Sequence, residues 1–94
     1  MVTYKEVAQK TVEREMEVIG KELAIRVAKE TDNLDIDDEG NISRLGENKK
    51  DIIDELVAGY QDITGDIAVS IIARAIKDIG GDELDLPKRL ENRM

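Results

Sequence analysis

The chain has 94 residues, of which 40% are hydrophobic and 38% are charged, and its net charge at neutral pH is −8. This length fits a single domain, and the apolar content excludes a wholly disordered chain. The negative charge argues against nucleic acid and anionic membrane surfaces as partners, because both are bound through Lys and Arg. Cysteine and histidine do not occur, which excludes disulfides, thiolate metal sites and a histidine general base. A chain without cysteine and without a long apolar stretch is expected in the cytoplasm.

A long amphipathic helix is predicted from Thr3 to Thr31. Its apolar stripe runs from Ala8 to Val27 at spacings of three and four residues. Gly20 lies near the middle, where glycine costs about 1 kcal/mol relative to alanine, and can mark a bend or a close helix crossing. A straight helix of this length would span about 43 Å at 1.5 Å per residue. We therefore expect part of it to protrude, to bend, or to pack on a second molecule.

A second, thinner apolar stripe on the same helix predicts an interface. Val7, Val18 and Ile25 lie away from the main stripe. Single exposed apolar residues are common on protein surfaces, so the alternative is that these three are scattered surface positions. A twofold homodimer is the commonest closed assembly, and we predict self-association, with another protein as the alternative partner.

The segment 34–45 predicts a β-hairpin. Two short β-like runs flank a three-residue loop that ends with Gly40, which can take the positive φ that such a loop requires. This register pairs Asp37 with Asn41 and Ile36 with Ile42. Because an isolated two-stranded hairpin is marginal in water, we expect it to lie on a helix face or to extend another sheet.

The hairpin tip is also a candidate cation site. Asp35, Asp37, Glu39 and Asn41 place oxygen ligands at alternate positions, as the EF-hand loop does for Ca²⁺. Gly46 stands where that loop supplies its bidentate carboxylate, so the match is degenerate. The alternative is a polar turn, in which Asp, Asn and Gly gather for their turn geometry. No cofactor other than calcium is predicted.

Two further helices are predicted in the second half of the chain, at residues 48–62 and 66–79. Asn48 is a reasonable N-cap for the first of them. The second is the most apolar segment, and its β-branched residues leave a buried strand at 67–76 as the alternative. Its alanines and its length favour a helix. The tail at 82–94 is expected to form a short helix from Pro87 or to be disordered.

The predicted fold is mostly α (α+β), in the order α-β-β-α-α, with one helical domain at residues 1–81 followed by the tail. No set of residues forms a catalytic constellation, so we do not expect an enzyme. We expect a small interaction or regulatory module that self-associates, and the alternative is a calcium-binding domain.

Overall fold

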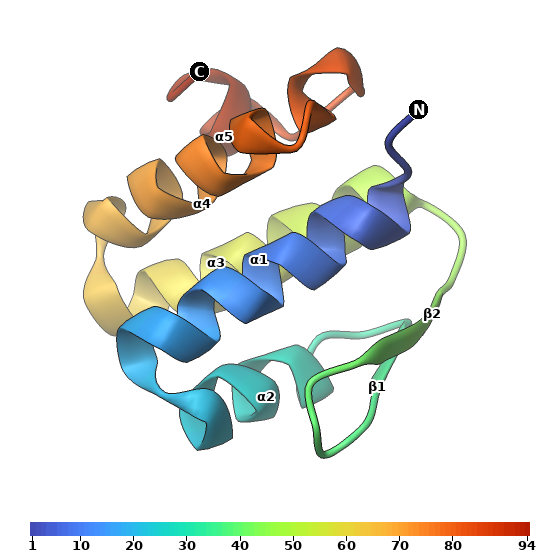
Figure 1. Cartoon of the computed structure of the whole chain (residues 1–94), viewed down its shortest axis with the longest axis vertical. Coiled ribbons are helices and arrows are strands. Elements are labelled where there is room, and N and C mark those ends of the chain that lie inside the picture. The colour runs from blue at the N-terminus through green and yellow to red at the C-terminus, as the bar shows by residue number, and fades with distance from the viewer.

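The computed structural model describes residues 1–94 and confirms the mostly α fold with a hairpin between helices (Figure 1). The elements in chain order are α1 (Tyr4–Ile19), α2 (Lys21–Lys29), β1 (Leu34–Ile36), β2 (Ile42–Leu45), α3 (Lys49–Thr64), α4 (Asp66–Asp78), the 3₁₀ turn η1 (Gly81–Glu83) and α5 (Lys88–Glu91). No helix is both long enough and apolar enough to cross a membrane.

The predicted N-terminal helix is bent into two at Gly20. α1 begins after Thr3, whose hydroxyl accepts the Glu6 amide while the Glu6 carboxylate accepts the Thr3 amide. At Gly20 the backbone turns to φ 92° and ψ 153°, and its N–H donates to the carbonyl of Met16 at 3.1 Å. α2 then folds back beside α1 (Figure 1). The bend keeps the radius of gyration at 11.6 Å, and no long helix protrudes.

The hairpin has the predicted register. Ile36 pairs with Ile42, and the Asp37 amide donates to the Asn41 carbonyl at 3.0 Å. Gly40 has the predicted positive φ, at 92°. The register shifts between Asp35, which pairs with Arg44, and Ile36, so that Ser43 is an extra residue on β2.

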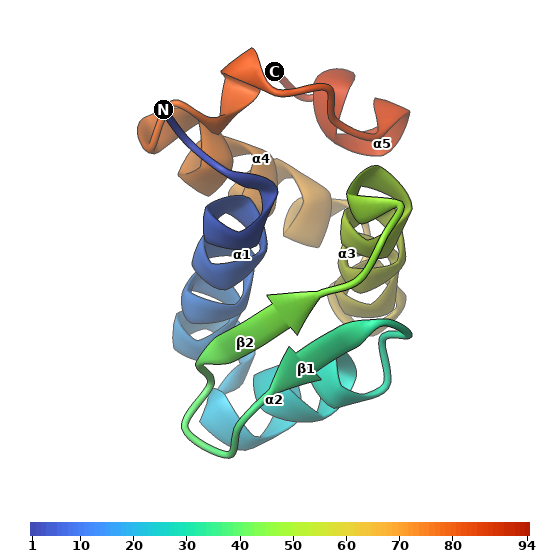
Figure 2. The ribbon, with the colours of Figure 1, turned by 90° about the vertical axis from the view of Figure 1, so that its right-hand side faces the viewer.

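One side chain of α1 fixes the hairpin to the helices. The Gln9 amide nitrogen donates to the Gly40 carbonyl, and its oxygen accepts the Ile42 amide, both at 2.8 Å. A methyl group on Gly40 would lie 2.9 Å from the sulfur of Met16, so the loop passes directly over α1. The hairpin therefore lies on a helix face, as predicted, with α1 and α2 behind it (Figure 2).

Segment 66–78 is a helix, not a strand. α4 packs against both α1 and α3, which explains its wide apolar surface. Asn48 precedes α3 in the left-handed conformation, at φ 58°, and its side chain makes no capping hydrogen bond. Asn48 is therefore the N-cap residue by position, as predicted, but it does not form the side-chain hydrogen bond expected of an N-cap.

The tail is part of the core. Leu86 and Leu90 are fully buried and belong to the same apolar cluster as the helices. The Arg89 guanidinium bonds the carboxylate of Asp54 at 2.5 Å and the amide oxygen of Gln61 at 2.6 Å, both on α3. The short helix predicted from Pro87 is present, and the tail lies folded over α3 and α4.

Candidate functional site

The three residues predicted as an interface have different surroundings. Val7 is fully buried beside Gly81, and Ile25 is only 6% exposed, beneath the hairpin residue Gly40. Val18 is 40% exposed. The bend at Gly20 folds α2 back and brings Ile25 under the hairpin. Val7 lies on α1, as Val18 does, and is covered by the segment at Gly81. Val7 and Ile25 are therefore core residues, and only Val18 is available to a partner.

Val18 lies in the last turn of α1, and two other exposed aliphatic residues lie at helix ends on the same side of the molecule. α1 and α4 pack against each other and run in opposite directions (Figure 1). Glu17 near the end of α1 and Ser70 near the start of α4 line one groove. The last turn of α1, the last turn of α3 and the first turn of α4 thus share one end of the bundle (Figure 1). Ile63 and Ile67 stand at this end, on α3 and α4. We call Val18, Ile63 and Ile67 the apolar tip.

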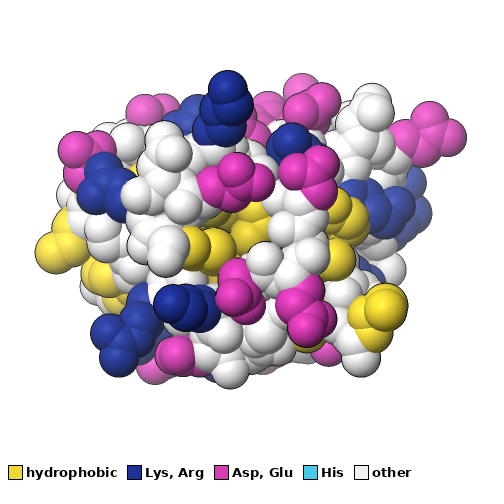
Figure 3. All heavy atoms as spheres, turned by 90° about the horizontal axis from the view of Figure 1, so that it is seen from above, with side chains coloured by type: hydrophobic (Ala, Val, Ile, Leu, Met, Phe, Trp, Pro, Cys, Tyr) yellow, Lys and Arg dark blue, Asp and Glu magenta, His cyan; other side chains and the backbone are white.

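The apolar tip is accessible. Seen from above, hydrophobic side chains protrude at the left-hand end of the molecule, which is the end where α3 passes into α4 (Figure 3). Sequence reasoning missed Ile63, because it fell on the predicted core arc of its helix. It missed Ile67 because the helix around it is apolar on most sides.

The predicted cation ligands are engaged within the chain. Asp35 pairs with Arg44 at 2.9 Å across the hairpin, and Glu39 pairs with Lys21 of α2 at 2.9 Å. No three acidic side chains come together in a way that could hold a metal ion. The calcium site stays a prediction, and amide shifts confined to residues 34–47 on calcium titration are the result that would support it.

Asp37 has a structural role in the turn. Its carboxylate accepts the backbone amides of Glu39 and Asn41, both at 2.9 Å. The Asn41 amide, with those of Glu39 and Gly40, holds the pKa of this carboxyl below its ordinary value. The Asp37 carboxylate is therefore hydrogen-bonded to the loop backbone, as in an Asx-turn.

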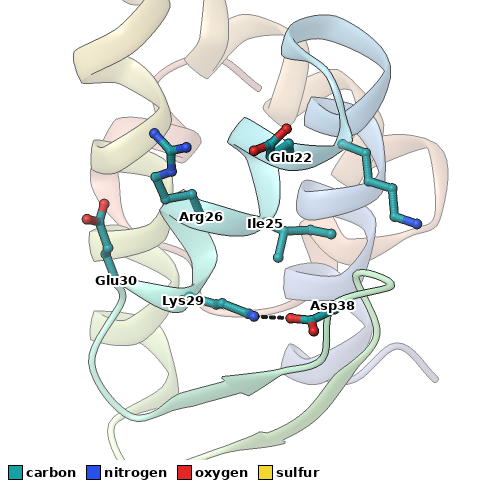
Figure 4. A pocket seen from close by; sticks show the side chains of 7 residues that line it. Glu22, Ile25, Arg26, Lys29, Glu30 and Asp38 are labelled. Carbon is teal, nitrogen blue, oxygen red and sulfur yellow. Dashed lines mark hydrogen bonds and ion pairs between the residues drawn. The ribbon is translucent and has the colours of Figure 1, made fainter.

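A groove of about 560 Å³ lies on the outer face of α2, beside the hairpin tip (Figure 4). Its walls carry three basic and three acidic side chains around Ile25: Lys21, Arg26, Lys29, Glu22, Glu30 and Asp38. Lys29 pairs with Asp38 across the groove. The opposite charges balance, so the groove selects for neither an anion nor a cation.

A buried carboxyl is the most unusual group in the structure. Glu15 of α1 is 0% exposed, and neither carboxylate oxygen has a hydrogen-bond partner. Burial raises its pKa, and the Arg14 charge offsets this only in part. Burial also raises the pKa of Tyr60, whose hydroxyl donates to the Ala24 carbonyl at 2.8 Å. The sequence carried a signal for the burial of Glu15, because Ala8, Val12, Glu15 and Ile19 lie on one face of the helix.

Comparison with known protein families, curated proteins and solved structures returned no match for this chain. The function proposed below therefore comes from the chemistry of its own residues.

Proposed function

We propose that the chain is a small protein-interaction module that associates with a second copy of itself through the apolar tip. The observation that carries this proposal is exposure: Val18 is 40% accessible, Ile63 42% and Ile67 62%. The only other large hydrophobic side chains that are exposed belong to the terminal residues Met1 and Met94. Exposed apolar groups that gather in one place are typical of contact surfaces, whereas single ones need no explanation.

A second copy fits the position of the apolar tip. The tip is formed by helix ends at one end of the molecule (Figure 1), so two copies can meet end to end about a twofold axis. In such an interface the same patch contacts itself, which is the commonest closed arrangement of soluble proteins. Three aliphatic side chains make a small patch, and small patches support weak and transient association.

Charge gives this association a distinctive dependence on salt. Each copy carries a net charge of −8, and Glu17, Asp62 and Asp66 are exposed around the tip. Two copies therefore repel one another at low ionic strength, and added salt screens that repulsion. Association through the tip should strengthen with salt. Binding to a basic partner would weaken under the same conditions.

The double variant Ile63→Thr/Ile67→Thr tests the proposal. Threonine keeps the β-branched shape and removes apolar area, worth about 0.8 kcal/mol per buried CH₂. We expect the association constant, measured by light scattering over a concentration series, to fall by about tenfold or more. The control variant is Lys77→Arg, which keeps the charge at an exposed position in the last turn of α4, and it should keep the wild-type association.

The result that contradicts the proposal is a mass of 10.5 kDa for the wild type at every concentration and salt level. An association constant unaffected by the double variant would place the contact elsewhere on the molecule. The proposal assigns no catalytic residue, and the absence of enzymatic activity stays a prediction.

A further inference from the structure

Glu15 is the only charged residue among the buried side chains of the chain, and the only one with buried polar atoms that lack a hydrogen-bond partner. A buried ionised carboxylate without a partner is strongly disfavoured, and such a group changes its protonation state instead. An unsatisfied buried polar group in a folded protein calls for a specific explanation. The interaction proposed above leaves Glu15 without a role.

Nothing that faces Glu15 can balance its negative charge. The buried surfaces of the other helices and of the hairpin contain one further titratable group, Tyr60 of α3. Its hydroxyl proton is donated to the Ala24 carbonyl of α2. On α1 itself the nearest cation is Arg14, whose guanidinium pairs with the exposed carboxylate of Glu17 at 3.3 Å.

Glu15 lies close to the bend between α1 and α2. It precedes Val18 by about one turn of α1, and Gly20 follows. On the other side of the bend, α2 is tied to α3 by the hydrogen bond from Tyr60 to Ala24. A methyl group on Gly20 would meet no atom within 4 Å, so the space around the bend is open. Loosening of the core at Glu15 would therefore act on the segment where α1, α2 and α3 meet.

We propose that Glu15 is a proton-operated switch, which keeps the bundle closed while its carboxyl group is neutral and opens the contact between α1, α2 and α3 when the proton leaves. The step transfers one proton from the carboxyl group to water and breaks no other covalent bond. Opening brings the carboxylate to solvent. This inference concerns the bundle alone and holds whether or not the apolar tip binds a second copy.

The direction of the pH dependence follows from linkage. In the closed state burial raises the pKa of Glu15 above its ordinary value, while in the open state the exposed carboxyl regains that ordinary value. At a pH between the ordinary and the raised pKa of Glu15, the open form holds fewer protons than the closed form. Protonation of Glu15 therefore stabilises the closed form fully at a pH below the ordinary pKa. This stabilisation is lost as the pH rises through the raised pKa. The opening constant should increase by up to about tenfold per pH unit across this window and then level off.

Native-state hydrogen exchange of the full chain, followed from pH 4 to pH 8, tests the proposal. After correction for intrinsic exchange rates, the opening constants of the amides around Gly20 in the wild type should rise with pH. In Glu15→Gln, which keeps the shape and cannot ionise, this rise should disappear. The matched control is Glu13→Gln, which makes the same chemical change at an exposed position on α1 and should behave as the wild type. Identical pH profiles for the wild type and Glu15→Gln would overturn the proposal.

A second measurement needs no variant. The side-chain carboxyl carbon of Glu15 in the folded wild type, followed by ¹³C NMR, should titrate well above the ordinary value of about 4.3 for glutamate. A midpoint at the ordinary value would also overturn the proposal, because the carboxyl would then be solvated in the closed state.

Discussion

Replacing Leu90 by alanine is expected to lower the free energy of unfolding by about 2–5 kcal/mol, as measured by urea denaturation. Leu90 is 0% exposed and belongs to the main core cluster, although it lies four residues before the end of the chain. α5 packs on α4, so the truncated side chain would leave a cavity between two elements. The surrounding helices are held by other contacts and can fill such a cavity only in part.

The matched control for this prediction is Met94→Ala, which truncates an exposed side chain and should change stability by no more than about 0.5 kcal/mol. If Leu90→Ala changed the free energy of unfolding as little as Met94→Ala, the tail would not be packed against the helices. The helical domain would then end near residue 81, as predicted from the sequence.

Replacing Gly20 by alanine is expected to produce a domain-swapped dimer that persists at dilutions at which the weak association through the apolar tip has dissociated. Gly20 has φ 92° and ψ 153°, a conformation that costs a residue other than glycine about 1–3 kcal/mol. In a continuous helix, alanine is favoured over glycine by about 1 kcal/mol. The two effects together shift the balance by about 2–4 kcal/mol toward one straight helix from Thr3 to Thr31. That helix carries α2 away from α3, and the α2 of a second copy can fill the vacant place.

Light scattering at a concentration at which the wild type has a mass of 10.5 kDa measures this outcome as a mass near twice that value for Gly20→Ala. The control is Gly80→Ala, which introduces similar strain at φ 80° in a turn that does not join two segments of one predicted helix. This control should be destabilised and should keep the oligomeric state of the wild type. A Gly20→Ala variant that is less stable but still monomeric would show that the bend is set by packing and not by glycine.

The elements of the fold could be predicted where local chemistry decides them. Gly40 and the alternation around it specified the hairpin and its register, because only a residue that accepts positive φ closes so short a loop. The helices were visible as periodic patterns, including α4, whose alanines outweighed its β-branched residues.

The site could be predicted only in part, because burial depends on how helices are oriented relative to one another. Val7, Val18 and Ile25 share a face on a continuous helix, but the bend at Gly20 moves Ile25 under the hairpin. Val7 is buried by the segment at Gly81, which lies far along the chain. The helical pattern places Glu15 on the apolar face between Val12 and Ile19, but it does not show that the folded chain leaves the carboxylate without a hydrogen-bond partner. The burial of Leu90 depends on contacts with α4, which lies earlier in the chain.

The central claim, association through the apolar tip, is tested most directly by a concentration series of two-dimensional amide NMR spectra at low and high salt. We expect shifts that grow with concentration, that grow further with salt, and that concentrate at residues 16–20 and 61–68. Spectra that do not change with concentration, or shifts confined to the hairpin at residues 34–45, would contradict the claim.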